Sequence, residues 1–335
     1  MTENLPKITV ITATFNLIKD GREAFFRQCV ESVHNQTYPN IEHIVMDGAS
    51  TDGTLDLIRE YEEKGWLKCY SEPDEGMWDG MNKGLRRATG DYIQFLNSDD
   101  FFISNKVLEE CATVMANKQT DYLFGNFCIC DKNNNISRQI ASLPIELFWY
   151  HQPYNHEALF VKKSVYLRLG GYDMKYKTTI DYAFIIKLIL NDCSHEYIDR
   201  PIIASRPGGA TNNKNGFTET VLDTVSLLYS DLYTSFCDYT RDQYKQLFCK
   251  KDFEPSFLSL LQRFVVKKKL SNFNYAFFLK KTEVKNNTLI DNNFATKRKT
   301  RLFLFGFIPL LKIVKLKNSI SYRLFNIITI FKIKG

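Results

Sequence analysis

The sequence predicts an α/β fold built on a mostly parallel, doubly wound central sheet flanked by helices. Strand-like and helix-like segments alternate four times before residue 100, and this rhythm is typical of βαβ units whose strands run parallel. A polar cluster follows each of four predicted elements, where open α/β sheets bind their ligands. Because these clusters lie at one sheet edge in such a fold, they predict a single site made of residues 12–16, 47–54, 72–79 and 97–100.

The predicted elements follow from residue type and spacing. Residues 7–14 are a β-branched run, which favours a buried strand. Apolar residues then recur at helical spacing over 24–33. The same reasoning gives a second strand at 41–46, a second helix at 55–64 and a short strand at 66–71.

A loop at 71–84 leads into a helix that continues through Ala88, and the strand that starts at Asp91 ends in Asn-Ser-Asp-Asp at 97–100. Two adjacent carboxylates at the end of a buried strand repel each other and lose hydration, so a cation usually accompanies them. Hard oxygen ligands suit Mg²⁺ or Mn²⁺, particularly beside a phosphate. The alternative is a simple turn, since Asn, Ser and Asp are favoured turn residues.

Composition excludes several classes of protein. The 335 residues are 44% apolar and include eight scattered cysteines, without zinc spacing or a secreted disulfide framework. The N-terminus lacks a signal-peptide pattern, and no apolar run reaches the ~20 residues that span a bilayer. We therefore expect a cytoplasmic protein.

Phosphate-binding loops of the common kinds are missing. No Gly-x-Gly-x-x-Gly follows the first strand, and no Gly-x-x-x-x-Gly-Lys-Ser/Thr occurs. Dehydrogenase and P-loop functions are therefore disfavoured. Without a glycine cradle, a diphosphate at this site needs another source of positive charge, and a metal ion on Asp99 would supply it.

With these motifs in order, the sequence resembles a family 2 glycosyltransferase, of the kind that builds bacterial O-antigens, capsules and exopolysaccharides. The resemblance covers about residues 7–210 and implies the GT-A fold. It rests on the order and spacing of several motifs: Thr-Ala-Thr-Phe-Asn at 12–16, Asp-Gly-Ala-Ser-Thr-Asp-Gly-Thr at 47–54, Asp-x-Gly-x-x-Asp-x-Met-Asn-Lys-Gly at 74–84, Phe-Leu-Asn-Ser-Asp-Asp at 95–100, Asn-His-Glu-Ala-Leu-Phe at 155–160, Gly-Gly-Tyr-Asp at 170–173, Thr-Thr-Ile-Asp-Tyr at 178–182 and Pro-Gly-Gly at 207–209.

The resemblance implies roles for individual residues. Those assigned to donor binding are Thr12, Thr14, Asn16, Asp47, Gly48, Ser50, Asp52, Asp74, Asn82, Lys83, Asn97 and Ser98. The family's Asp-x-Asp metal motif reads Asn97-Ser98-Asp99 here, so an amide replaces the first carboxylate. Asp99 is then the expected ligand of Mn²⁺ or Mg²⁺, with Asp100 structural.

The resemblance also places the catalytic base at Asp181, in the first turn of a predicted helix whose apolar face includes Ile180 and Phe184. The alternative is that this carboxylate only complements the helix dipole. His156 and Glu157 fall on the acceptor side, although a histidine beside an apolar run is more often a core residue. Trp78 could stack on a sugar, with the core as its expected place.

The last part of the chain differs from the rest in charge. The first 291 residues carry 34 basic and 38 acidic side chains, whereas ten Lys or Arg and no acid lie beyond. We divide the chain into a GT-A catalytic domain (1–214), a helical extension (215–295) and a basic amphipathic tail (296–335). The tail places Ile320, Leu324 and Phe331 on one helical stripe, which is typical of a membrane-surface anchor.

The function implied is metal-dependent, inverting transfer of a single sugar from a nucleotide-sugar donor, most often a UDP-sugar, to a lipid-linked or oligosaccharide acceptor. The tail would hold the enzyme on the inner face of the cytoplasmic membrane. The tail could instead pack on the catalytic domain. Nucleic acid is not an expected partner. The protein could also form a homo-oligomer. Alternatives are a sugar nucleotidyltransferase, whose glycine-rich opening loop is absent, and a degenerate nucleotide-sugar-binding scaffold, suggested by Asn97.

Overall fold

The computed structural model describes residues 5–145, 148 and 152–207, a few positions between 224 and 243, and the backbone of four strands between 299 and 334. The chain divides into two compact units, Met1–Asn274 and Tyr275–Gly335. Most of the predicted helical extension at 215–295 lies outside the described residues.

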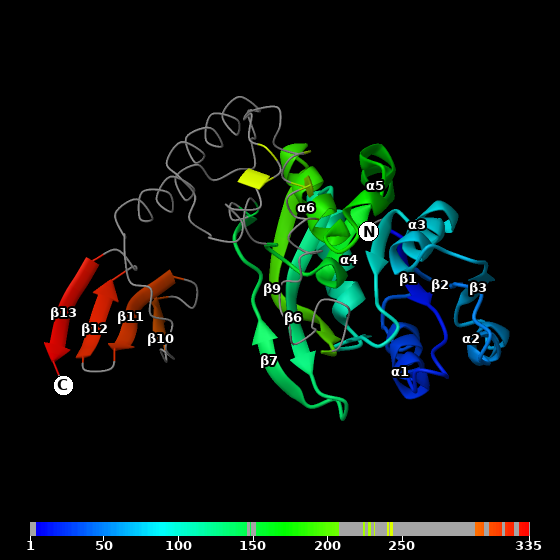
Figure 1. Cartoon of the computed structure of the whole chain (residues 1–335), viewed down its shortest axis with the longest axis horizontal. Helices are drawn as coiled ribbons and strands as arrows, with labels where there is room; N and C mark the ends of the chain where they lie inside the picture. The colour runs from blue at the N-terminus through cyan, green and yellow to red at the C-terminus, as the bar shows by residue number, and fades with distance from the viewer. Residues whose placement is uncertain are drawn as a thin grey trace. The chain divides into compact units, whose positions relative to one another are not determined.

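The first unit contains a mixed nine-stranded sheet with helices on both faces (Figure 1). Its strands follow the order β3-β2-β1-β4-β8-β6-β9-β5, with β7 paired to β6. The strands are β1 (Ile8–Thr14), β2 (Ile41–Asp47), β3 (Lys68–Ser71), β4 (Tyr92–Phe95), β5 (Phe101–Phe102), β6 (Tyr122–Cys130), β7 (Ile136–Ile140), β8 (Leu159–Lys162) and β9 (His195–Ser205). The helices are α1 (Glu23–His34), α2 (Thr54–Glu63), α3 (Met77–Arg87), α4 (Val107–Lys118), α5 (Lys163–Leu169) and α6 (Ile180–Leu190), with 3₁₀ turns η2 (His156–Ala158) and η3 (Met174–Tyr176).

The N-terminal half of the sheet is parallel, as the alternating pattern predicts. β1 pairs in parallel with both β2 and β4, and β2 pairs in parallel with β3. The carboxyl ends of these four strands therefore share one edge. Beyond β4 the sheet becomes mixed, because β8 runs antiparallel to both β4 and β6.

Two helical layers sandwich the sheet. On one face, Cys29 and Val33 of α1 share a core with residues of α4 and with Ile8 and Val10 of β1. On the other face α3 approaches β1 closely: a Cβ on Gly84 would lie 2.5 Å from Ile11 Cγ2. Tight packing of this kind fixes the position of α3 on the sheet, and with it the loops at the strand ends.

Helix α6 differs from its predicted one-sided character. Besides Ile180 and Phe184, it buries Tyr182, Ile185 and Ile186, so almost its whole circumference is covered. The ring of Tyr166 in α5 stacks on Phe184 with centroids 4.4 Å apart. A helix enclosed on all sides holds its first turn, which carries Asp181, in a fixed position.

The C-terminal unit contains a four-stranded antiparallel sheet, β10 (Lys299–Leu304), β11 (Ile308–Leu316), β12 (Ser319–Leu324) and β13 (Ile328–Lys334). The helical stripe expected for this segment is therefore wrong. The reason is its content of β-branched and aromatic residues in short alternating runs, which favours strands. No helix in the part of the chain that the structure describes is long and apolar enough to cross a membrane.

The four strands form two similar hairpins, β10–β11 and β12–β13. The register shift between Leu302 and Phe303 in the first hairpin recurs between Tyr322 and Arg323 in the second. The sequence repeats in step, with Leu-Phe at 304–305 and at 324–325. The sheet is thus built from one hairpin pattern used twice.

Candidate functional site

The carboxylate of Asp47, at the end of β2, connects three strand ends. Its Oδ1 accepts a hydrogen bond of 2.5 Å from the Ser50 hydroxyl, and its Oδ2 accepts from Ser50 N at 3.0 Å and from Ser71 Oγ at 2.7 Å. The Thr14 hydroxyl lies 3.5 Å from Oδ1. Asp47 is only 1% exposed, so its oxygens are occupied by the protein itself.

The loop after β1 is tied to the loop after β2. Asn16, with a φ of +46°, donates its N–H to Ser50 Oγ, and its side-chain oxygen accepts from Thr51 N at 3.1 Å. Asp52 accepts from the N–H of Lys19 at 2.7 Å. These bonds hold both loops in one conformation at the sheet edge where the nucleotide-sugar donor is predicted to bind.

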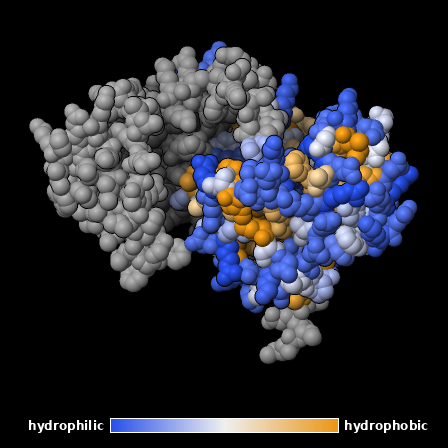
Figure 2. Space-filling model, turned by 90° about the horizontal axis from the view of Figure 1, so that it is seen from below, coloured by the Kyte–Doolittle hydropathy of each residue, from blue (hydrophilic) through white to orange (hydrophobic). Residues whose placement is uncertain are grey.

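Two residues of the first motif lie in opposite environments. Thr12 is fully buried, and its hydroxyl lies 3.2 Å from Nε2 of His43 in the neighbouring strand β2. The surface of the first unit that Figure 2 shows is mostly hydrophilic, with a few hydrophobic patches. Phe15 is nevertheless 57% exposed, although it is a large apolar side chain next to the site. An exposed ring at a strand end offers a flat surface on which a planar group can stack.

Asp74 is enclosed between two glycines. A Cβ on Gly48 would lie 2.8 Å from Asp74 Oδ2, and one on Gly80 would lie 3.1 Å from it. Burial raises the pKa of Asp74, while the N–H of Gly76 donates to its Oδ1 at 2.9 Å. Gly48 and Asp74 thus lie together, as their shared assignment to the donor site requires.

Asn82 and Lys83 in α3 are engaged by neighbouring backbone. The Asn82 amide donates to Tyr172 O at 2.8 Å and accepts from Tyr172 N at 2.9 Å. Lys83 Nζ donates to Pro73 O and lies 3.1 Å from Asp79 Oδ2. In this arrangement both side chains hold loops in place, and their contact with a donor stays a prediction.

Buried groups hold the loop 97–100 in place through hydrogen bonds. Asn97 N donates to Glu157 Oε1 at 2.9 Å, and Asp100 Oδ1 accepts from Arg206 N at 2.7 Å. Burial and the nearby Asp100 carboxylate raise the pKa of Glu157 well above its usual range. Glu157 is 1% exposed, so it lies behind the loop and supports it.

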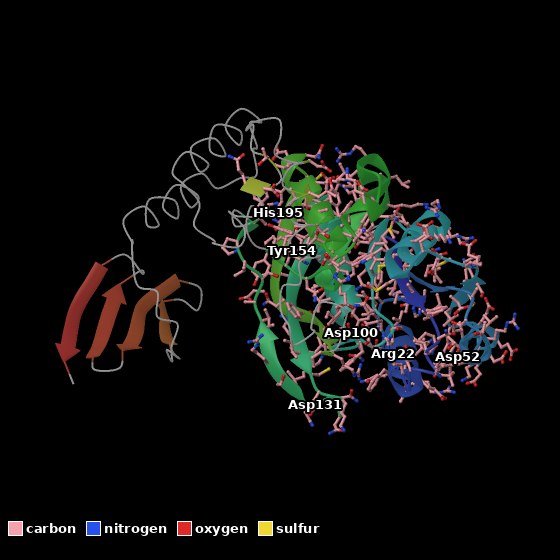
Figure 3. All side chains as sticks on the ribbon, in the orientation of Figure 1. Arg22, Asp52, Asp100, Asp131, Tyr154 and His195 are labelled. Carbon is pink, nitrogen blue, oxygen red and sulfur yellow. The ribbon has the colours of Figure 1, made fainter. Side chains whose placement is uncertain are left out.

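Asp99 is the carboxylate of this loop that faces outward, with 27% of its side chain exposed. Its Oδ2 lies 3.0 Å from Nη2 of Arg22, which also donates to Ser98 Oγ at 3.3 Å. Figure 3 labels Arg22, the residue directly before α1. Asp99 therefore already accommodates a cation, in this case a guanidinium.

These residues fit a divalent cation whose other ligands come from a substrate. Asn97 Oδ1 is buried and has no hydrogen-bond partner among the described residues, so an unpaired amide oxygen occurs two positions before Asp99 in the same loop. No group of three or more His, Cys, Asp or Glu side chains that could hold a metal occurs in the described part of the chain. The protein thus offers two oxygen-bearing side chains and would need a diphosphate to complete the coordination.

Asp181 and His156 form a second cluster. His156 Nδ1 lies 3.5 Å from Asp181 Oδ2, and Gln152 Nε2 donates to the same oxygen at 2.8 Å. Burial opposes the charge on Asp181, but the contacts with His156 and Gln152 outweigh it and lower its pKa below the usual value. The ring of the partly buried Trp78 lies 5.1 Å from that of His156 and 4.8 Å from that of the buried Tyr172, so it packs between this cluster and the core.

The short turn η2 joins the two clusters. His156 contacts Asp181, and the next residue, Glu157, binds the backbone of Asn97. The carboxylate that could bind a cation and the carboxylate that could accept a proton are therefore linked through two consecutive residues. This connection is the central geometric fact of the site.

Sequence reasoning missed several members of the site. Arg22, Gln152 and Arg206 have no motif of their own, and each contacts a partner far away in the chain. The only sequence signal for Arg22 is a basic residue in the loop after the first strand, which is too common to be selective.

Comparisons with known proteins agree with the fold. The family model described as Glycosyl transferase family 2 matches residues 9–174. The chain is 32% identical over 189 residues to an uncharacterized glycosyltransferase of Mycobacterium tuberculosis, covering 55% of this chain and 70% of the relative. It is 24% identical over 221 residues to the PGL/p-HBAD biosynthesis glycosyltransferase of Mycobacterium bovis, covering 65% and 81%.

Two solved structures share the architecture. The S. aureus TarS 1–349 structure in complex with UDP-GlcNAc matches with a TM-score of 0.55 and 18% identity, covering 77% of this chain and 80% of that one. The mannosyltransferase PcManGT of Pyrobaculum calidifontis, in complex with GDP-Man and Mn²⁺, matches with a TM-score of 0.53 and 17% identity, covering 83% and 79%. Their similarity concerns the fold, which is of the GT-A type.

Proposed function

Since this chain belongs to glycosyltransferase family 2, we propose that it transfers a single sugar from a nucleotide-sugar donor to a hydroxyl of a lipid-linked glycan, with inversion at the anomeric carbon. The observation that carries this proposal is the connection through η2 between Asp99, which can bind a cation, and Asp181, which can accept a proton. The glycan would belong to a surface polysaccharide; one relative of this chain is a PGL/p-HBAD biosynthesis glycosyltransferase, which is a biosynthetic enzyme of the same family.

The donor would lie along the parallel strand ends. Phe15, exposed beside Asn16, offers a stacking surface for the nucleobase, and the absence of a side chain on Gly48 lets Asp74 lie directly against the loop after β2. Asp99 and Asn97 would hold a divalent cation at the diphosphate, where its charge stabilises the leaving group. UDP-sugars and GDP-mannose are the first candidates, because TarS and PcManGT were solved with UDP-GlcNAc and with GDP-Man and Mn²⁺.

Asp181 would act as the general base. Its lowered pKa keeps it ionised at neutral pH, and Gln152 and His156 both contact Oδ2, which orients the carboxylate. The acceptor oxygen attacks the anomeric carbon while its proton passes to Asp181, and the bond from that carbon to the diphosphate oxygen breaks. One displacement of this kind inverts the configuration.

The experiment is release of nucleoside diphosphate from a panel of UDP-, GDP- and dTDP-sugars, with Mn²⁺. We expect turnover of one donor, and its loss by about 100-fold or more in Asp181→Asn. Asp56→Asn, an exposed residue of α2, is the matched control and should keep full activity. Full turnover by Asp181→Asn would contradict the assignment of the base, and no turnover of any donor would favour a binding scaffold. Release of pyrophosphate from a nucleoside triphosphate and a sugar phosphate would identify a nucleotidyltransferase instead.

The C-terminal sheet would bind the enzyme to the inner surface of the cytoplasmic membrane. Residues paired across an antiparallel sheet lie on the same face. The observed register therefore divides the strands into one face with apolar residues and one with basic residues. The first face comprises Leu302, Leu311, Ile313, Ile320, Tyr322, Leu324, Phe331 and Ile333, together with Thr300 and Lys315; the basic residues of the second are Lys299, Arg301, Lys312, Arg323, Lys332 and Lys334.

An amphipathic sheet in the membrane interface can bury its apolar face among acyl chains and place its basic residues among anionic headgroups. Each basic residue contributes about 1 kcal/mol near an anionic surface. Replacing Arg301, Lys312, Arg323 and Lys332 together by Gln should release the full chain from phosphatidylglycerol vesicles in a sedimentation assay, whereas Lys315→Gln on the other face should not. Unchanged binding of the fourfold variant would contradict the membrane role.

A further inference from the structure

Arg22 contacts Asp99, the carboxylate that would bind the metal ion. It precedes α1 directly, and its Nη2 lies 3.0 Å from Asp99 Oδ2 and 3.3 Å from Ser98 Oγ. Among the described residues, Asp99 is the only carboxylate within ion-pair distance of Arg22. The guanidinium is a planar, positively charged group with several N–H donors, so it suits a carboxylate or a phosphate.

The ion pair between Arg22 and Asp99 is weak enough for another cation to replace the arginine. The Arg22 and Asp99 side chains are 34% and 27% exposed, and partly exposed pairs of this kind contribute little to stability. A divalent cation chelated by a diphosphate offers Asp99 twice the charge and a second anchor. The arginine can therefore yield its place when the metal arrives with its nucleotide, but it competes with a metal that arrives alone.

We propose that Arg22 neutralises Asp99 in the ligand-free site, excludes free divalent cations from it, and turns to the donor diphosphate once the metal–nucleotide complex takes the carboxylate. This inference rests on the proposed role of Asp99 in donor binding. A guanidinium released close to a diphosphate forms charge-assisted, often bidentate hydrogen bonds to its oxygens. Arg22 thereby makes binding of the metal depend on binding of the donor.

The test measures binding and needs no turnover. Manganese electron paramagnetic resonance on the full chain should show that Arg22→Met binds free Mn²⁺ about 3- to 10-fold more tightly than the wild type, in the absence of nucleotide. In calorimetry without metal, the same variant should bind UDP or GDP, whichever the wild type binds, about 10-fold more weakly. Arg22→Gln should show the same two changes in affinity. Agreement between the two variants excludes a folding defect of one of them as the cause.

Arg27→Met is the matched control, because Arg27 lies on the next turn of α1 and pairs with Glu23 and Glu60. It should leave both affinities unchanged. Equal or weaker Mn²⁺ binding by the Arg22 variants would overturn the inference. Asp99→Asn separates this from the proposed function: if it abolishes Mn²⁺ binding in the presence of nucleotide, the donor site stands whatever the Arg22 variants do.

Discussion

His156 and Asp181 belong to different sequence motifs, yet Nδ1 of the histidine is 3.5 Å from Oδ2 of the aspartate. The His156 ring lies 5.1 Å from that of Trp78, and His156 Nε2 is buried without a hydrogen-bond partner among the described residues. A carboxylate that contacts one imidazole nitrogen fixes the ring, which leaves the other nitrogen available to a group that enters the site.

The first prediction concerns the pH dependence of the reaction. In His156→Phe, burial still opposes the charge on Asp181 but one group that stabilises it is gone, so the pKa of Asp181 rises. The acidic limb of kcat should then move to higher pH.

A pH–rate profile of donor turnover checks this result. His34→Phe is the control, since His34 is exposed on α1 and stacks on Trp66, a contact that phenylalanine keeps. An unchanged acidic limb in His156→Phe would mean that Asp181 does not depend on the histidine.

The second prediction concerns Glu42, which connects strand β2 to the turn before β4. It accepts hydrogen bonds from Thr9 Oγ1, Lys68 Nζ and Thr89 N, and although burial opposes its charge these bonds lower its pKa from 4.5 to about 2. Because the folded-state pKa is depressed, the stabilisation is present above pH 4.5 and is lost as the pH falls toward 2. Glu42→Gln should lower the free energy of unfolding by on the order of 2 kcal/mol at pH 7.

Urea unfolding at pH 7 and at pH 3 measures this contribution. The difference between Glu42→Gln and the wild type should shrink at the lower pH, and Glu63→Gln, at an exposed end of α2, should match the wild type at both. A difference that is the same at both pH values would show that the charge of Glu42 is not what stabilises the fold.

The third prediction concerns the packing of α3 on the sheet. In Gly84→Ala the new Cβ would lie 2.5 Å from Ile11 Cγ2 and 3.1 Å from Met46 Cγ, so the helix has to move away from β1 and β2. Overpacking of this kind costs about 1–3 kcal/mol of stability. Thermal unfolding should show the loss, whereas Arg86→Ala on the exposed side of α3 should stay within about 0.5 kcal/mol of the wild type.

The fourth prediction separates two roles of Asn82. Its amide makes two hydrogen bonds to the backbone of Tyr172, so Asn82→Ala should cost about 1–3 kcal/mol of unfolding free energy. If the residue also contacts the donor, KM for the nucleotide sugar should rise in addition. Chemical unfolding and steady-state kinetics on the same variant read these effects independently, and wild-type stability would contradict the structural role.

Much of the fold could be predicted because it depends on local pattern. The apolar run before Asn16 and the helical spacing after it are set by neighbours in the chain, and β1 and α1 formed where these patterns predict. The tail shows the limit. Ile320, Leu324 and Phe331 fit a helical stripe as well as alternating strands, and pairing of β12 with the strands on either side is what makes them part of a sheet.

For the candidate site, the sequence by itself determined the order of strand ends, and with it which polar clusters meet at one edge. Only the tertiary structure decided which side chains stay available there. Asp47 and Asn82 are occupied by Ser50, Ser71 and the Tyr172 backbone, while Asp99 faces outward toward Arg22. The physical reason is that the succession of strands and helices along the chain follows from local periodicity, whereas a hydrogen bond or ion pair between distant parts of the chain exists only once the layers have packed.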